Sequence, residues 1–374
     1  MKAYVSCVGC EQRELDSQRV INYLKKNELD ITNNPANADY LFIVTCGVDL
    51  NSQKTSLQSI QTINNQMSAS AKLIIGGCLP DINPLSLKQF NVYHTFSPQT
   101  IDTLDKVLNF PISISDIDFP NTSVFDTQNT LTNQTSRERF EQAKNGYKVV
   151  IADGCLGECS YCAIKEATGK LNSRPLETLV TQFKIGIENQ EPTIMLMAGD
   201  TGSYGRDINS DFHSLLKEIT SIKGNSQIYI HDFGVNWLIR DISKFLQIFD
   251  SAEERKLFGG ITFPIQSGSN RILRRMRRQY EISQTIDALN QLGKYSFDIG
   301  THIMVGFPGE TEQDFNETIS LLDQVKFDFI TCFPYSETPV AESASLDKKV
   351  DLETVKRRIE KLQTIFQEKI KVIM

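Results

Sequence analysis

Three closely spaced cysteines follow one apolar run and place the strongest constraint on the fold of this chain. Cys155, Cys159 and Cys162 lie in GCLGECSYCAIK, directly after YKVVIA, which has the pattern of a buried strand. Thiolates at this spacing on one loop can hold three irons of a [4Fe-4S] cube and leave the fourth iron open. Three unrelated reduced thiols are the plainer alternative, and a zinc site would need a further ligand close by, whereas the nearest histidine is His213. The chain must therefore present this loop at the end of a strand.

Three more cysteines near the N-terminus each follow a short apolar run. Cys10, Cys46 and Cys78 come after AYVSCV, YLFIVT and KLIIGG, and helical patterns separate these runs. Strands that alternate with helices predict a parallel sheet whose strand carboxyl ends share one edge, where open α/β sheets bind ligands. We therefore expect the three thiols to converge as ligands of a second cluster. The alternative is that each cysteine is a small apolar residue at a buried strand end.

Six further strand candidates, each followed by a helical pattern, begin at Tyr147. They are YKVVIA, TIMLMAG, IYIHDFG, GGITFPIQ, IGTHIMVGFP and FITCFPY. The expected fold class is α/β, with an N-terminal parallel-sheet α/β domain and a partial (β/α)6 barrel, whose active site would lie at the strand carboxyl ends. The expected domains are 1–110 for the α/β domain with its cluster, 111–145 for a polar linker, 146–345 for the barrel and 346–374 for a C-terminal helix.

The cysteine triplet, with Tyr161 before its last member, resembles the signature of the radical S-adenosylmethionine (SAM) superfamily. Nearly the whole chain is similar to the methylthiotransferases, which replace an unactivated C–H bond by C–SCH3. GCLGECSYCAIK, GKLNSRP and GDTGSYGRDI look most like the branch that modifies threonylcarbamoyladenosine in tRNA, and PIQSGSNRILRRMRRQY, GFPGETEQDF and FPYSETPVAES match later segments of the family in order. We expect no C-terminal RNA-binding β-barrel (TRAM) domain, because the sequence stops after its last helical pattern.

The resemblance implies two [4Fe-4S] clusters and SAM as cofactors. The cluster on Cys155, Cys159 and Cys162 would cleave SAM, and the auxiliary cluster on the three N-terminal cysteines would supply the sulfur. Further candidate SAM contacts lie at strand ends: Tyr161, Gly199, Asp200, Thr201, Gln266, Ser267 and the turn 306–309. Asp200 with its neighbouring glycines could instead form an ordinary turn, and Tyr161 could simply pack.

Two other groups of side chains have open interpretations. His231 and His302 lie in expected strands, where a satisfied core histidine is commoner than a catalytic one. Arg271, Arg274, Arg275 and Arg278 fall on one expected helical face, which predicts either a contact for RNA phosphates or a solvated helix.

The charge and hydropathy of the chain bear on its partners. The formal net charge of −7 disfavours broad binding of polyanionic nucleic acid. The sequence has neither a signal-peptide core nor a membrane-spanning stretch, so we expect a cytoplasmic protein with reduced thiols and no membrane association.

Three functions follow from the sequence as hypotheses. The first is methylthiolation of a modified tRNA adenosine, with electrons from a flavodoxin- or ferredoxin-type donor. The second is methylthiolation or sulfur insertion on a peptide or small natural product, which the net charge and the missing TRAM domain favour. The third is a non-enzymatic iron-sulfur electron carrier, which a test for SAM cleavage would separate from both.

Overall fold

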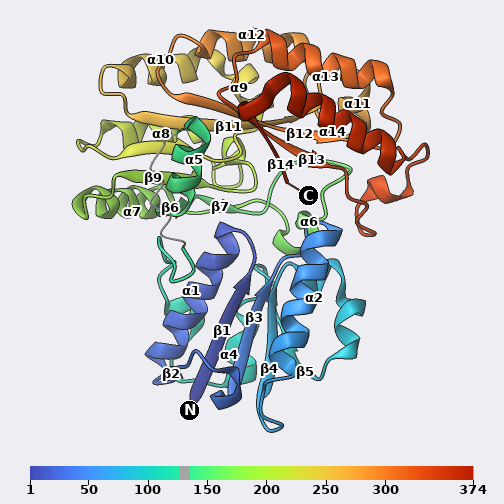
Figure 1. Ribbon diagram of the computed structural model, residues 1–374. Coiled ribbons are helices and arrows are strands. Elements are labelled where there is room, and N and C mark those ends of the chain that lie inside the picture. The colour runs from blue at the N-terminus through green and yellow to red at the C-terminus, as the bar shows by residue number, and fades with distance from the viewer. Residues whose placement is uncertain (127–134, 374) are drawn as a thin grey trace. The chain divides into compact units, whose positions relative to one another are not determined.

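A computed structural model describes residues 1–126 and 135–373 of the chain. Contacts between these residues divide them into two units (Figure 1). The first unit comprises residues 1–126, 162–170 and 337–341, and the second comprises 135–161, 171–336 and 342–373. Each unit contains its own parallel sheet, which confirms the expected α/β fold class.

The first unit is built on a five-stranded parallel sheet in the described residues, with strand order β2-β1-β3-β4-β5. Its strands are β1 (Lys2–Val8), β2 (Asp30–Ile31), β3 (Tyr40–Thr45), β4 (Lys72–Gly77) and β5 (Val92–Thr95). Its longer helices are α1 (Glu11–Lys26), α2 (Leu50–Asn64) and α4 (Thr103–Leu108), and shorter ones are α3 (Leu79–Ile82) and α6 (Ile164–Thr168). The three strands predicted from apolar runs are present as β1, β3 and β4.

Helices cover both faces of this sheet (Figure 1). Val20 and Leu24 of α1 and Leu104 of α4 pack with Phe42 and Val44 on one face. Ile60 and Ile63 of α2 pack with alternate residues of β3 and β4 on the other. Strands that are buried on both faces read as continuous apolar runs, which is why the sequence identified them.

The second unit contains a seven-stranded parallel sheet in the part of the chain that is described, with strand order β14-β13-β12-β11-β10-β9-β6. Its strands are β6 (Tyr147–Val150), β9 (Thr193–Met197), β10 (Gln227–Ile230), β11 (Phe258–Gln266), β12 (Asp298–Val305), β13 (Phe329–Pro334) and β14 (Ile370–Val372). The first six are those predicted from the sequence. β14 was not predicted; it pairs in parallel with β13 after the C-terminal helix α14 (Leu352–Phe366).

One face of this sheet forms the large core under a row of helices. These helices are α7 (Leu176–Glu188), α8 (Phe212–Ser221), α9 (Val235–Arg240), α10 (Ile242–Glu253), α11 (Asn270–Arg275), α12 (Ile282–Leu292) and α13 (Glu312–Gln324), with α14 at the end of the row. A small antiparallel pair, β7 (Ala152–Asp153) with β8 (Asn172–Ser173), lies beside the cysteine loop in sequence. No helix of residues 1–126 or 135–373 is long and apolar enough to cross a membrane.

The segment expected to be a linker is more ordered than its composition indicated. Ile114 and Ile117 are buried in the core of the first unit, and helix α5 (Ser136–Lys144) begins at Thr135 with a complete capping box to Glu138. Phe140 of α5 packs against Tyr229 in the second unit. Residues 127–134, the middle of the expected linker, lie outside the described residues.

Candidate iron-sulfur centres and the neighbouring strand ends

Cys10, Cys46 and Cys78 lie immediately beyond the carboxyl ends of β1, β3 and β4. The N–H of Cys78 donates to the carbonyl of Thr45 at 2.9 Å, so the chain after β4 touches the end of β3. Desolvation, with smaller contributions from the nearby Cys46 and Cys78 thiols, raises the pKa of the Cys10 thiol to about 12, although the charge of Arg13 lowers it. The three thiols therefore interact electrostatically at one sheet edge, as the parallel topology predicts.

A glycine makes the approach of β4 to β3 possible. Gly77 has φ +93°, and a Cβ on it would lie 2.2 Å from the carbonyl oxygen of Thr45. No side chain fits there, and the left-handed backbone conformation favours glycine as well. Gly77 thus sets the position of the next residue, Cys78.

Arg13 is a functional candidate that the sequence did not reveal. Its side chain is only 2% exposed, and its Nη1 lies 3.6 Å from Sγ of Cys78, while its Nε lies 2.9 Å from Asp16. Desolvation raises the pKa of the Cys78 thiol, and the charge of Arg13 lowers it. Its position three residues after Cys10, one turn into α1, is the signal that could have identified it.

Cys155 and Cys159 of the triplet flank Gly157. The N–H of Gly157 donates to Sγ of Cys155 at 3.1 Å. A Cβ on Gly157 would lie 3.2 Å from that sulfur and 3.7 Å from Sγ of Cys159, so both sulfurs border one small space. Cys155 and Cys159 belong to the second unit. Cys162 begins the segment 162–170, which groups with the first unit.

A guanidinium lies against Cys159. Nη1 of Arg278 donates to Sγ of Cys159 at 3.5 Å, and Nε of Arg278 donates to the hydroxyl of Tyr280 at 3.1 Å. The Tyr280 hydroxyl in turn donates to the carbonyl of Ile265 at 2.6 Å. A permanent positive charge is thereby fixed beside one thiol of the triplet.

The prediction that four arginines share one helical face is wrong. Helix α11 ends at Arg275, and Arg277 takes φ +58°, which turns the chain so that Arg278 faces Cys159. Arg271 binds the carboxylate of Asp314 and the carbonyl of Gly309. These side chains are therefore held by the fold itself.

Asp200 and its neighbours form a tightly bonded turn after β9. The Asp200 carboxylate accepts hydrogen bonds from Gly202 N–H at 3.1 Å, Gly234 N–H at 3.0 Å and Trp237 Nε1 at 2.7 Å. Thr201 is fully buried. A Cβ on Gly199 would lie 3.0 Å from the carbonyl oxygen of Gly154, so Gly199 lets this turn pack against the cysteine loop. Both oxygens of Asp200 are thus used by the turn, as expected for a residue with a structural role.

Gln266, at the end of β11, has features of a ligand contact. Its φ is +76°, its side chain is buried, and its Oε1 has no hydrogen-bond partner among the described residues. Strained backbone and orphaned buried acceptors gather at binding sites. Ser267, by contrast, is fully buried and accepts from Ser269 N–H at 3.1 Å, and Tyr161 packs edge-on against Phe307.

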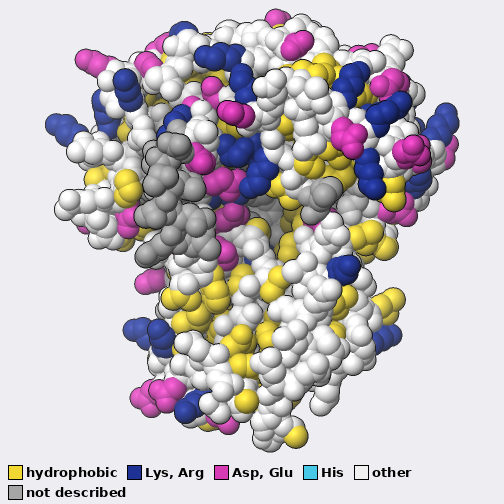
Figure 2. Space-filling view, in the orientation of Figure 1, with side chains coloured by type: hydrophobic (Ala, Val, Ile, Leu, Met, Phe, Trp, Pro, Cys, Tyr) yellow, Lys and Arg dark blue, Asp and Glu magenta, His cyan; other side chains and the backbone are white. Residues whose placement is uncertain are grey.

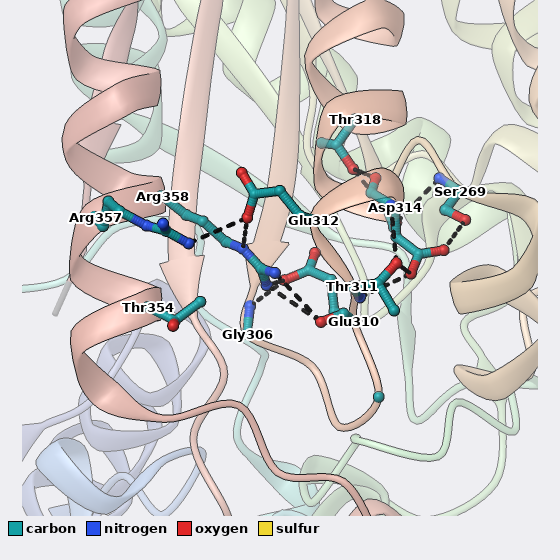
Figure 3. Close-up of polar contacts among 12 residues, drawn as sticks. Ser269, Gly306, Glu310, Thr311, Glu312, Asp314, Thr318, Thr354, Arg357 and Arg358 are labelled. Atoms are coloured by element: carbon teal, nitrogen blue, oxygen red, sulfur yellow. Dashed lines mark hydrogen bonds and ion pairs between the residues drawn. The ribbon is translucent and has the colours of Figure 1, made fainter.

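The turn 306–309 after β12 is held by a buried ion pair (Figure 3). The Glu310 carboxylate accepts from the N–H of Gly306 at 2.7 Å and from Nη1 of Arg358 at 2.8 Å. Burial raises the pKa of Glu310 to about 7, although Gly306 and Arg358 lower it. The N–H of Gly309 donates to the carbonyl of Lys348 at 2.7 Å. Two N–H groups of this turn are therefore used within the fold.

Comparisons with known proteins agree with this two-unit arrangement. Residues 2–96 match the uncharacterized protein family UPF0004, and residues 149–322 match the radical SAM superfamily. The ribosomal protein uS12 methylthiotransferase RimO of Clostridium tetani is 30% identical over 100% of this chain and 83% of its own length. The probable threonylcarbamoyladenosine tRNA methylthiotransferase of Methanocaldococcus jannaschii is 29% identical over 98% of this chain and 83% of its own length.

The chain belongs to the radical SAM methylthiotransferase family. It is a methylthiotransferase, and this family carries two [4Fe-4S] clusters and SAM. Among solved structures, the radical SAM methyltransferase TsrM from Kitasatospora setae is similar in fold, with a TM-score of 0.62 over 88% of this chain and 74% of that one, at 11% identity.

The cysteines of this methylthiotransferase suit such clusters. All eight are free thiols; Cys10, Cys46 and Cys78 follow β1, β3 and β4, and the triplet 155–162 follows the short strand β7 in sequence. Within residues 1–126 and 135–373, no three His, Cys, Asp or Glu side chains are placed to hold a single metal ion. A cube of four irons needs a wider arrangement, because each iron takes its own thiolate. Metal binding takes the deprotonated thiolate, and desolvation raises the pKa values of the thiols at Cys10, Cys46 and Cys78.

Proposed function

We propose that this methylthiotransferase modifies an adenosine of tRNA that carries a threonylcarbamoyl group. The observation that carries the proposal is the likeness of GCLGECSYCAIK, GKLNSRP and GDTGSYGRDI to the branch with that substrate. Relatives with this name, from Methanocaldococcus jannaschii and Thermotoga maritima, match 98% and 96% of the chain. The proposed reaction replaces an aromatic C–H bond of the modified base by C–SCH3.

Ribosomal protein uS12 is the second candidate acceptor. Relatives named for uS12 are as similar as those named for tRNA, at 29–30% identity against 27–29%. Identity alone therefore does not choose between them. The net charge of −7 would favour a protein acceptor, and Figure 2 shows basic and acidic side chains mixed over the visible face of the second unit.

We assign the two clusters by the cysteine sets. Cys155, Cys159 and Cys162 would hold the cluster that binds SAM, and Cys10, Cys46 and Cys78 would hold the auxiliary cluster. When bound, these groups supply the one-electron chemistry and the sulfur that the protein itself lacks. Arg278 and Arg13 each place a positive charge beside one cysteine of a set, which stabilises the thiolate form that binds iron.

The remaining proposals concern the residues that contact SAM, the cellular location, the electron donor and the domains. Gln266 is the best placed of the proposed SAM contacts, because its Oε1 lacks a partner in the described structure; Gly199, Asp200, Thr201, Ser267 and Tyr161 would act by shaping the pocket. We further propose a cytoplasmic enzyme that receives electrons from a flavodoxin- or ferredoxin-type protein. For the domains, we propose the α/β domain and the barrel expected from the sequence, with residues 111–126 added to the first unit and 135–145 to the second in place of a separate linker.

A competition between acceptors tests the function. The reconstituted enzyme, SAM and a reductant would be incubated anaerobically with tRNA that carries threonylcarbamoyladenosine, or with purified uS12. Mass spectrometry of the digested RNA should show a nucleoside heavier by one sulfur and one CH2. Modification of uS12 in place of tRNA would overturn the assignment of the acceptor and leave the reaction type intact, whereas SAM cleavage without any methylthio product would count against both candidates.

A further inference from the structure

Three titratable side chains meet on the face of the second sheet that the helix row does not cover. Nδ1 of His231 lies 3.1 Å from Oδ2 of Asp232, and Nδ1 of His302 lies 3.3 Å from Oδ1 of the same carboxylate. The two imidazole centroids are 6.2 Å apart. We call these three residues the His-Asp-His cluster.

The alternation of side chains along each strand places the cluster on that face. Ile228 and Ile230 of β10, like Ile299 and Ile303 of β12, belong to the core under the helices. Side chains alternate along a strand, so His231 and His302 point to the opposite face. In sheets of this type that face, at the strand carboxyl ends, forms the substrate site.

Aromatic side chains close the same face below the cluster. Phe140 of α5 contacts Tyr229 and Phe329, with centroid distances of 5.7 and 5.3 Å, and glycines at 260 and 300 leave room for these rings. Phe140 also lies 6.0 Å from the His231 ring. The polar His-Asp-His cluster thus lies directly next to a group of packed aromatic side chains on this face of the sheet.

The cluster is joined to the cysteine loop through a short series of contacts. The carbonyl of Asp232 accepts the N–H of Thr201 at 3.0 Å, and Thr201 belongs to the turn whose Gly199 abuts Gly154. The N–H of Asp232 donates to Oγ1 of Thr262 at 2.9 Å and holds the residue at φ +54°. The carboxylate is therefore fixed at the strand ends, close to where Cys155 begins the triplet.

Asp232 also fixes which nitrogen of each ring carries the proton. A carboxylate oxygen only accepts, so Nδ1, which faces Asp232, is the nitrogen that carries the proton when a ring is neutral, and Nε2 is then an acceptor. Oδ1 of Asp232 makes no hydrogen bond within the described residues, so this buried oxygen is itself an unsatisfied acceptor in the cluster. Each histidine side chain is 16% exposed, so a ligand can reach it.

We propose that the His-Asp-His cluster is the site that binds the acceptor base, through N–H groups that donate to Nε2 of His231 and His302. This inference rests on the proposed function. Acceptor atoms beside a carboxylate select a donor such as the carbamoyl-amino N–H of a threonylcarbamoyl substituent.

Equilibrium binding to the unreduced enzyme tests the site without turnover. The reconstituted enzyme with SAM, but no reductant, would be titrated with the nucleoside N6-threonylcarbamoyladenosine by calorimetry. His302→Leu and His231→Leu remove an acceptor and should each weaken binding about tenfold, as expected for one hydrogen bond. His302→Gln keeps an acceptor oxygen and should fall between. His213→Leu, on α8 outside the cluster, is the matched control and should bind as the wild type does.

A second nucleoside and a second readout complete the test. N6,N6-dimethyladenosine has no N–H at that position and should bind more weakly, with no dependence on either histidine. The iron content and thermal midpoint of each variant should match those of the wild type, which shows that the barrel is folded, and His213→Leu should also cleave SAM as the wild type does. Wild-type affinity in both leucine variants, or no binding of N6-threonylcarbamoyladenosine by the wild type, would overturn the site. Histidine-dependent binding of a uS12 peptide instead would overturn the assigned ligand.

The site and the proposed function can fail separately. Histidine-dependent nucleoside binding with no methylthio product would refute the proposed function and leave the site. Full product formation by His302→Leu at unchanged nucleoside affinity would refute the site and leave the function.

Discussion

Nη1 of Arg278 lies 3.5 Å from Sγ of Cys159, so a permanent positive charge faces one of the cysteines proposed to hold the SAM-binding cluster. Hydrogen bonds to the sulfurs and the net charge of the surroundings set the reduction potential of an iron-sulfur cluster. A guanidinium stabilises the reduced cluster, which carries one more negative charge than the oxidised cluster. Arg278 therefore favours uptake of the electron on which SAM cleavage depends.

Replacement of Arg278 by methionine should lower the reduction potential of that cluster. The substitution removes both the charge and the N–H donor, and we expect a shift on the order of 60 mV, tenfold in the one-electron equilibrium. Arg278→Lys keeps the charge and should shift the potential less. A redox titration followed by electron paramagnetic resonance measures the shift, and Arg274→Met, an exposed arginine paired with Glu281, is the control. An unchanged potential in Arg278→Met at full iron content would contradict this role.

Triple replacement of the cysteines should separate the two clusters. The wild type should bind about eight irons per chain, and Ala at Cys155, Cys159 and Cys162 should leave about half of them. Ala at Cys10, Cys46 and Cys78 should also leave half, but this variant should still cleave SAM and yield no methylthio product. Iron analysis and chromatography of the SAM products check both statements. A triple variant of the 155–162 set that kept all its iron would disprove the ligand assignment.

Gly77→Ala should destabilise the first unit and disturb the auxiliary cluster. Its Cβ would lie 2.2 Å from the Thr45 carbonyl oxygen, and φ +93° is unfavourable for alanine, so we expect a loss of more than about 1 kcal/mol. The thermal midpoint and the iron content should both fall. Gly293→Ala, which meets no atom closer than 3.3 Å, is the control. Equal midpoints for the two variants would show that the chain relaxes around the added methyl group without cost.

The sequence predicted the strands well because their apolar residues run without interruption. β3 and β4, and six strands of the second sheet, are largely buried on both faces, so their apolar residues do not alternate with polar ones, whereas β1 is only half-buried. The cysteines follow these strands directly, so parallel topology alone placed them at sheet edges. β14 has only three residues, too few for a periodic signal, and it forms because β13 offers a free edge.

The missed features depend on tertiary contacts. Arg278 was assigned to a helical face because the helical periodicity of the sequence does not reveal where the helix ends. The positive φ of Arg277 turns the chain there. His231 directly follows β10 and His302 lies on β12, two strands separated by β11, so only the folded sheet brings both to Asp232. Helix α5 lies in a polar segment with little periodicity, although the spacing of Thr135 and Glu138 is a capping-box signal for its start.

His302 should stay neutral well below the usual range of histidine. Burial, with smaller contributions from His231, Lys144 and Arg137, lowers its pKa to about 4, although Asp232 raises it. Because the folded-state pKa of His302 lies below its value in the unfolded chain, the unfolded chain binds the proton first as the pH falls. The free energy of unfolding is therefore highest above about pH 6.5 and decreases as the pH falls toward 4. The chain has four histidines, so imidazole 15N spectra can be assigned with single variants. Asp232→Asn should lower the pKa of His302 further, and a His302 signal that titrates near pH 6.5 would contradict the buried position.

Glu310 should make the stability of the second unit depend on pH in a predictable direction. Burial raises its pKa from 4.5 to about 7, so between these values the folded protein holds a proton that the unfolded chain has lost. Stability therefore falls as the pH rises through this window, and Glu310→Gln, which cannot ionise, should lack that component. Thermal midpoints measured between about pH 5.5 and about pH 7.5 test the difference, with Glu360→Gln at an exposed site on α14 as the control. If Glu310→Gln kept the full pH slope of the wild type, other groups would produce that slope, and Glu310 would stay ionised beside Arg358 across this pH range.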